Sequence, residues 1–301
     1  MNGLDDDQSP LAGTEVHSLR SEHVGDEFKI FVGHCGELGG GAGLLHHRDR
    51  SDGMRPAVLY VTDANGMFAS AVDIVRSMQL SAHLPPMLVV GIGYRMGALA
   101  ETAVIRMRDF SPTADPLIAR IGPPETVMGG AERFLAFIRD ELQPWVAARY
   151  RVDPDDSTYF GHSLGGLFGT YVLLTEPTTF RNYGIGSPSL WWEDDTIFDY
   201  EANYAATHDD LAAKVFFAVG GFEDHDGRQR EASRLPAEER VKAGLRYIDM
   251  TADTLRMVDA LRARQYPNLD IASVVLPDEF HITVPFVNLS RSLRYLFDAP
   301  W

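Results

Sequence analysis

STYFGHSLGGLFGTY, residues 157–171, is the stretch that decides the fold. Its short apolar run at 158–160 predicts a strand, and the helix formers after Gly165 predict a helix. Between them, Gly161 and Gly165 flank Ser163 at the spacing G-x-S-x-G. A sharp turn there would expose the serine hydroxyl at the mouth of the strand, with side chains two residues away excluded by collision. The stretch therefore predicts a strand, a tight turn and a helix that present Ser163 as a nucleophile.

Strands and helices alternate over the rest of the chain. Apolar runs that predict buried strands occupy residues 56–62, 87–94, 183–185, 214–220 and 271–276, and an alternating pattern within 15–32 predicts further β-structure. Helical patterns lie between these runs and after the last of them. This alternation predicts an α/β fold with a mostly parallel central sheet and helices on both faces. Chemistry in such sheets gathers at the carboxyl ends of the strands.

The domain organisation is expected to be simple. Residues 1–14 are polar and acidic and predict a disordered leader, and residues 15–301 predict one domain. Within it, the segment 95–126 has the composition of a long irregular excursion, and 223–250 forms a second, charged excursion with helical composition. Pro144 should kink the helix that precedes the tight turn at Ser163.

Composition narrows the possible partners. The 301 residues include 27 basic and 43 acidic side chains, a net charge of −16, which disfavours nucleic acid and anionic membranes because both would repel the chain. The single cysteine, Cys35, cannot form an internal disulfide, and no segment resembles a signal peptide or membrane span. We therefore expect a cytoplasmic protein, monomeric or homodimeric, that acts on a small molecule.

A serine nucleophile requires a base and an acid that orients the base. His281 follows the last predicted strand, in the chain order serine, acid, histidine, and it is the best candidate base. His162 adjoins the serine and points away from it, which favours a packing or hydrogen-bonding role. Three carboxylates follow the strand at 214–220, namely Glu223, Asp224 and Asp226, and spacing alone does not choose among them.

Main-chain N–H groups should stabilise the oxyanion. One comes from Leu164, at the start of the elbow helix, and the other from Ala64 or Asn65, after the first buried strand. Substrate contacts are expected from apolar side chains and arginines near these turns. The candidates are Met67, Phe68, Trp191 and Trp192 for apolar walls, and Arg106 or Arg108 for a carboxylate or phenolate.

Six segments resemble one family of α/β-hydrolases, the esterase family that includes the enterochelin and salmochelin esterases. They are YVTDANGMF at 60–68, RDFSPT at 108–113, GGAERFL at 129–135, GHSLGGLF at 161–168, SPSLWW at 187–192 and HITVP at 281–285. The resemblance implies an α/β-hydrolase fold, Ser163 as nucleophile and His281 as base, and it favours Glu223 as the acid. This chain departs from the family pattern at Ala64, where relatives usually have glycine.

Together these features predict a serine carboxylic-ester hydrolase that works through an acyl-enzyme, without metal or organic cofactor, on siderophore-like or other bulky esters. An acyltransferase or thioesterase would use the same residues and differ only in the acceptor. A catalytically silent binding protein could retain the fold, but it would have little reason to keep serine, acid and histidine in this order.

Overall fold

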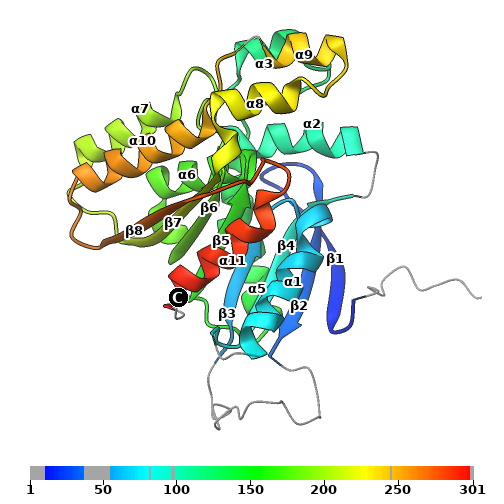
Figure 1. The fold of residues 1–301 in the computed structure, drawn as a ribbon. Coiled ribbons are helices and arrows are strands. Elements are labelled where there is room, and N and C mark those ends of the chain that lie inside the picture. Colours follow the sequence, from blue (N-terminus) through cyan, green and yellow to red (C-terminus); the bar gives the residue numbers. More distant parts are fainter. Residues whose placement is uncertain (1–10, 37–54, 81–82, 96–98, 245, 299–301) are drawn as a thin grey trace, which may run out of the picture.

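The computed structural model describes residues 11–36, 55–80, 83–95, 99–244 and 246–298. They form one eight-stranded sheet of order β1-β2-β4-β3-β5-β6-β7-β8 (Figure 1). The strands are β1 (Thr14–Arg20), β2 (Glu27–Cys35), β3 (Ala57–Val61), β4 (Met87–Tyr94), β5 (Ser157–His162), β6 (Asn182–Gly186), β7 (Ala213–Gly220) and β8 (Leu269–Leu276). Strands β3 to β8 run parallel, and β2 pairs antiparallel with both β1 and β4. The predicted α/β-hydrolase architecture is confirmed.

Helices cover both faces of the sheet. On one face, α1 (Ala64–Leu80) and α11 (Val284–Leu296) pack beside each other (Figure 1). The other face carries α4 (Ala131–Ala136), α5 (Gln143–Arg149), α6 (Leu164–Thr175), α7 (Ile197–Thr207) and α10 (Met250–Ala263). A 3₁₀ turn, Pro177–Thr179, follows α6. No helix among the described residues combines the length and apolar character that a bilayer crossing needs.

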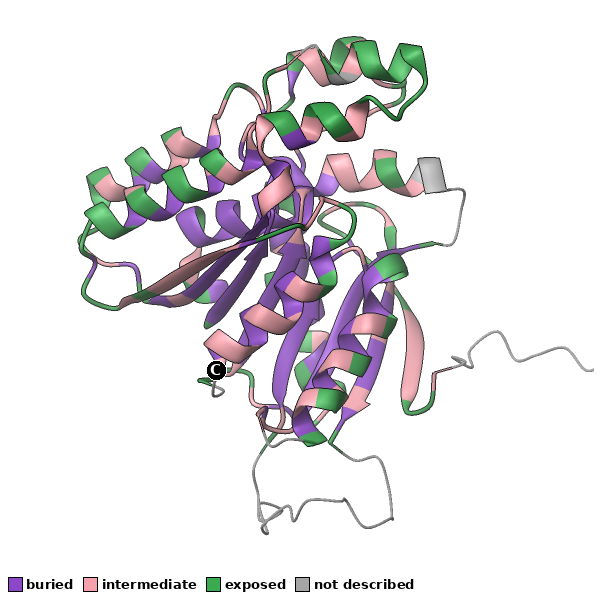
Figure 2. Cartoon of the chain, in the orientation of Figure 1, coloured by how far each residue is buried: buried purple, intermediate pink, exposed green. Residues whose placement is uncertain are grey.

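The central strands are buried along their whole length (Figure 2). Every residue of β3, β4 and β6 is buried, as the uninterrupted apolar runs predicted for strands covered on both faces. Cys35 lies at the end of β2 and is 4% exposed. Burial raises the pKa of its thiol to about 11, so it packs as a small apolar residue.

The segment 95–126 differs from the prediction. It was expected to be irregular, but it contains α2 (Leu99–Phe110) and the short α3 (Pro116–Ile121). Asp115 caps α3 by accepting from the N–H groups of Leu117 and Ile118, and Pro116 occupies the first turn, where its missing N–H is harmless. Pro116 and Gly122 therefore lie at the two ends of α3.

The segment expected as a charged excursion at 223–250 contains α8 (His225–Ala232) and α9 (Ala237–Ala243). Pro144 stands in the first turn of α5, directly after a π-helical segment, Phe137–Leu142, that joins α4 to α5. The kink at Pro144 stays a prediction. Residues 1–10 of the expected leader lie outside the described residues, and β1 already begins at Thr14.

Candidate active site

The turn after β5 places Ser163 in a strained backbone conformation. Its φ of 62° and ψ of −120° lie outside the regions that residues other than glycine favour, and α6 starts at the next residue. A Cβ on Gly161 would come within 2.4 Å of the Gly165 carbonyl oxygen, and a Cβ on Gly165 within 2.6 Å of Thr62 Oγ1. Both glycines are thus required by close packing, and the predicted strand, tight turn and helix around Ser163 are present.

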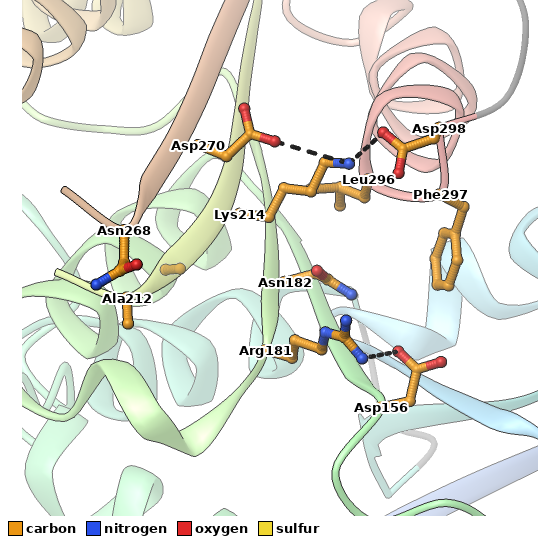
Figure 3. Close-up of a pocket in the computed structure, with 11 residues that line it drawn as sticks. Asp156, Arg181, Asn182, Ala212, Lys214, Asn268, Asp270, Leu296, Phe297 and Asp298 are labelled. Carbon is orange, nitrogen blue, oxygen red and sulfur yellow. Dashed lines mark hydrogen bonds and ion pairs between the residues drawn. The ribbon is translucent and has the colours of Figure 1, made fainter.

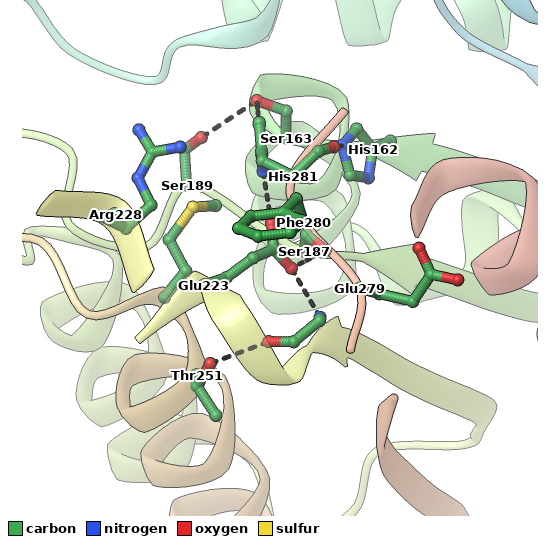
Figure 4. A network of polar contacts seen from close by, with 12 residues as sticks. His162, Ser163, Ser187, Ser189, Glu223, Arg228, Thr251, Glu279, Phe280 and His281 are labelled. Atoms are coloured by element: carbon green, nitrogen blue, oxygen red, sulfur yellow. Dashed lines mark hydrogen bonds and ion pairs between the residues drawn. The ribbon is translucent and has the colours of Figure 1, made fainter. Parts of the chain in front are cut away.

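His281, on the loop after β8, reaches the serine (Figure 4). Its Nε2 lies 3.0 Å from Ser163 Oγ, and its Nδ1 is hydrogen-bonded to Glu223 Oε1. These residues follow β5, β8 and β7 and meet at the carboxyl ends of the strands. The arrangement can pass a proton from the serine hydroxyl to the imidazole while the carboxylate fixes the orientation of the ring.

Glu223 is fully buried at the end of a 3₁₀ turn, Gly221–Glu223, after β7. Its second oxygen, Oε2, accepts from the N–H of Gly220 at 2.5 Å and from Ser187 Oγ at 2.6 Å. The two competing carboxylates are used elsewhere: Asp224 caps α8 by accepting from the N–H of Gly227 at 2.7 Å, and Asp226 lies in the first turn of that helix. Of the three candidates, the structure brings Glu223 to the histidine.

The turn after β3 lies against the elbow. Ala64 is the first residue of α1 and Leu164 the first of α6, and the close approach of Thr62 to Gly165 brings the two helix starts together. Backbone N–H groups in a first helical turn have no acceptor within the helix and form a site for negative charge. Asn65 secures this turn through its side chain, which donates to the carbonyl of Tyr94 at 2.9 Å and accepts from the N–H of Tyr94 at 2.7 Å.

Arg106 secures the same turn from α2. Its guanidinium donates to both carboxylate oxygens of Asp63, each at 2.7 Å, and Asp63 itself has a φ of 55°. Burial alone would lower the pKa of Arg106, but the Asp63 carboxylate outweighs it and raises that pKa. Arg106, which was considered for substrate contact, is therefore held in a bidentate ion pair beside the turn after β3.

His162 contacts the loop that carries the candidate base. Its Nε2 donates to the backbone carbonyl of His281 at 3.0 Å, and the two rings lie 4.7 Å apart. Burial, and to a lesser extent the neighbouring His281, lowers the pKa of His162 well below its usual value. The predicted hydrogen-bonding role is confirmed, and the neutral imidazole supports the loop at His281.

Three expected substrate contacts lie in the core. Met67 and Phe68 are 8% and 5% exposed and pack between α1 and the sheet, because α1 starts at Ala64 and turns them inward. Trp192 is 1% exposed, and its indole N–H donates to the carbonyl of Thr113 at 3.0 Å. The expectation that these three side chains form substrate walls is corrected: helical periodicity and a buried hydrogen bond place them inside the protein.

The other two candidates differ from each other. Arg108 donates to Asp109 and to Asp26 at 2.7 and 2.9 Å, so its guanidinium is already paired. Trp191 is partly buried, and the guanidinium of Arg246 lies 5.5 Å from its ring centroid. Trp191 therefore stays a candidate for substrate contact, whereas Arg108 ties α2 to the start of β2.

Two serines in the turn after β6 were not predicted as site residues. Ser187 donates to the buried Glu223, and Ser189 Oγ lies 3.4 Å from Ser163 Oγ (Figure 4). The only signal in the sequence was the SPSLWW segment, where both serines stand among residues that the family resemblance singled out.

The amino ends of β5 to β8 form a different kind of hollow (Figure 3). Lys214 bridges Asp270 and Asp298 at 3.7 and 2.5 Å, and Arg181 lies 4.0 Å from Asp156. These two basic side chains are thus paired with three acidic ones, and the described residues that line the hollow include neither serine nor histidine. The chemistry therefore lies at the opposite end of the strands.

A serine, a histidine and a buried glutamate in hydrogen-bond contact, on an α/β-hydrolase sheet, define the class of serine hydrolases. A family model described as "Putative esterase" matches residues 47–247, so the chain belongs to this esterase family and is a serine ester hydrolase.

Relatives and solved structures agree with this assignment. The chain is 31% identical to ferri-bacillibactin esterase BesA of Bacillus subtilis over 235 residues, 74% of this chain and 75% of that protein. It is 28% identical to the siderophore triacetylfusarinine C esterase of Aspergillus fumigatus over 84% of this chain and 86% of that one. The BES protein from Bacillus cereus superposes with a TM-score of 0.71 at 25% identity, over 98% of this chain and 99% of that one. Siderophore hydrolase EstB from Aspergillus nidulans superposes with a TM-score of 0.76 at 23% identity, with the same coverage, and supports the fold.

Proposed function

We propose that Ser163, His281 and Glu223 form a catalytic triad that hydrolyses carboxylic esters through an acyl-enzyme. The observation that carries the proposal is the continuous contact from Ser163 Oγ through His281 Nε2, at 3.0 Å, and on from Nδ1 to Glu223. A hydroxyl is a weak nucleophile until a base removes its proton, and an imidazole is an effective base only in the correct orientation.

The reaction has two halves. Ser163 Oγ attacks the ester carbonyl as His281 takes its proton, and the tetrahedral oxyanion accepts hydrogen bonds from the N–H of Leu164 and from that of Ala64 or Asn65. His281 returns the proton to the leaving alcohol. Water activated by the same imidazole then hydrolyses the acyl-enzyme and frees Ser163.

The surroundings of the triad favour bulky esters that carry anionic groups on aromatic rings, and we propose siderophore-like esters of this kind as the substrate. Two arginines lie over aromatic rings next to catalytic residues: Arg230 lies 5.5 Å from the ring of Phe222, and Arg234 lies 5.9 Å from that of Phe280. At the turn after β6, Arg246 also lies over the ring of Trp191, but its guanidinium is paired with Asp115 and Asp194, so only the Trp191 ring is a candidate contact there. Guanidinium groups and aromatic faces can both contact anionic aromatic groups. The named activities of the relatives point to the same class of substrate.

The test is covalent labelling of the folded protein with a fluorophosphonate, followed by mass spectrometry. We expect label on Ser163, and we expect Ser163→Ala to lower hydrolysis of a p-nitrophenyl ester by about 10⁴-fold or more. Ser292→Ala, which alters a buried serine on α11, is the matched control and should keep full activity. A label on another serine, or native activity in Ser163→Ala, would refute the triad.

The substrate class is tested separately. A cyclic tris-catecholate ester and a p-nitrophenyl ester of similar acyl size are compared by kcat/KM, with product analysis in water and in added alcohol. We expect higher kcat/KM for the catecholate ester and free acid as the product. An alkyl ester as the main product would identify an acyltransferase.

A further inference from the structure

The buried carboxylate of Glu223 is held from two sides. Oε1 faces His281, and Oε2 accepts two hydrogen bonds, from the N–H of Gly220 and from the hydroxyl of Ser187. Glu223 and Ser187 are both 0% exposed, so water does not compete for these contacts. Hydrogen bonds to a buried carboxylate stabilise its ionised form, which is the form that orients the imidazole.

Asn288, on α11, determines the direction of the Ser187 hydrogen bond. Its side chain is fully buried, and its Nδ2 lies 3.2 Å from Ser187 Oγ and 3.3 Å from the carbonyl oxygen of Ala218. A carbonyl oxygen only accepts, so the amide must present its NH₂ group to Ala218, and the same NH₂ group then donates to Ser187. The Ser187 hydroxyl therefore accepts from Asn288 through one of its lone pairs and donates its single hydrogen to the Glu223 carboxylate.

We propose that Ser187 and Asn288 are positioning residues of the active site. Asn288 orients the Ser187 hydroxyl, and Ser187 holds the Glu223 carboxylate in the position where it contacts His281 Nδ1. The proposal rests on the proposed roles of Ser163, His281 and Glu223. It extends the hydrogen-bonded chain from the nucleophile to α11, on the face of the sheet opposite α6.

The backbone at Ser187 agrees with this role. Its φ of 38° is a left-handed conformation that costs about 1 kcal/mol or more for a residue with a side chain. Glycine would remove the strain, but it would also remove the hydroxyl. Strained residues other than glycine persist where the surrounding structure determines their position, and they are frequent at active sites.

The first test is Ser187→Ala, assayed with a p-nitrophenyl ester. Loss of one charge-assisted hydrogen bond to a buried carboxylate should lower kcat by about 10- to 100-fold, with KM within about two-fold, because Ser187 serves the carboxylate and not the substrate. The fluorophosphonate labelling rate of Ser163 should fall by the same factor. Ser292→Ala is again the matched buried-serine control.

A double-mutant cycle separates positioning from a general structural role. If Ser187 acts through the carboxylate, adding Ser187→Ala to Glu223→Gln should lower kcat by less than about two-fold. If it only supports the fold, the same 10- to 100-fold factor should recur in both backgrounds, and the proposal would be overturned.

Asn288→Asp is the second variant and carries the test if Ser187→Ala does not fold. It keeps the size of the side chain but places an acceptor where Ser187 needs a donor, so the hydroxyl turns toward the introduced carboxylate and away from Glu223. We expect a loss of kcat in the range given for Ser187→Ala, again with unchanged KM.

The outcomes distinguish the two proposals. Wild-type protein that is not labelled at Ser163 would contradict the proposed function. Labelled and active wild-type protein, together with kcat within about two-fold of it in Ser187→Ala and Asn288→Asp, would contradict the positioning role alone.

Discussion

The carboxyl ends and the amino ends of the parallel strands differ in how far their carboxylates are buried. At the carboxyl ends, Glu223 is fully buried and each of its oxygens is hydrogen-bonded. At the amino ends, Lys214 contacts Asp270 and Asp298, whose side chains are 59% and 86% exposed. A buried carboxylate keeps its charge only when its partners are fixed, whereas an exposed pair is exchanged for water at little cost.

Strained backbone recurs in the turns at the carboxyl ends of the strands. The non-glycine residues Asp63, Ser163, Ser187 and Asp278 have positive φ values and stand one or two residues after β3, β5, β6 and β8. Sharp turns at these positions direct side chains and N–H groups into one space. Four strained turns and the buried hydrogen bonds of Glu223 therefore lie at the same end of the sheet.

The largest loss of activity is expected from removing the carboxylate of Glu223. Glu223→Gln should lower kcat by about 10³- to 10⁴-fold, because the amide no longer stabilises the imidazolium or selects the correct tautomer. Asp224→Asn and Asp226→Asn are the matched controls and should stay within about three-fold of wild type, since asparagine also caps helices. Steady-state kinetics on a p-nitrophenyl ester provide the measurement. A loss with Asp224→Asn equal to that with Glu223→Gln would assign the acid differently.

Arg106 offers the next largest effect. Arg106→Gln leaves Asp63 without its bidentate partner, and we expect about 1–3 kcal/mol less stability and about 10-fold lower kcat, because the oxyanion turn loses its anchor. Arg108→Gln, on the same helix, also breaks an ion pair but lies away from that turn, so it should destabilise the fold without changing kcat. Urea unfolding and kinetics are measured together. A raised KM in Arg108→Gln would restore that arginine as a substrate contact.

At the carboxyl ends, His162 should make the stability of the fold depend on pH. Its folded-state pKa is lowered, so below about pH 6.5 the unfolded chain binds a proton that the native chain does not, and stability falls as the pH falls. Between about pH 6.5 and 5 this amounts to at most about 2 kcal/mol. In His162→Gln, which keeps a donor for the carbonyl of His281, that part of the slope should disappear. Denaturant unfolding at several pH values measures it, and an unchanged slope would mean that His162 binds a proton in the folded state.

The smallest effect is expected at the amino ends. Lys214→Met removes an ion pair with exposed partners, so it should cost at most about 1 kcal/mol and leave kcat unchanged. Its effect on stability should decrease further in high salt, because exposed charges are screened. A loss of activity in this variant would mean that the two ends of the sheet are coupled.

Much of the fold was predictable because its signals are local. Uninterrupted apolar runs gave the buried strands, and Gly161 and Gly165 gave the elbow, since each reports a steric demand of its immediate neighbourhood. The helices of residues 95–126 were missed because the prolines and glycines that stand around α2 and α3 gave the whole segment the composition of a loop. Met67 and Phe68 were misjudged because α1 already starts at Ala64, and the start of the helix decides which way they face.

The candidate site divides in the same way. Ser163 and His281 follow from the elbow and the order of the chain, but Glu223, Asp224 and Asp226 are chemically alike and nearly adjacent, so nothing local separates them. The 3₁₀ turn after β7 and the parallel pairing of β7 with β8 turn Glu223 inward and leave Asp224 to cap α8.

The strand, turn and helix around Ser163 follow from the amino-acid order alone, because backbone sterics act between residues that are neighbours in the chain. Long-range folding brings Glu223 to His281 across 58 residues and His281 to Ser163 across 118, and it brings Ser187 and Asn288 to their support from other elements. Hydrogen bonds require partners within about 3 Å, and that proximity is created by the pairing of strands and the packing of helices.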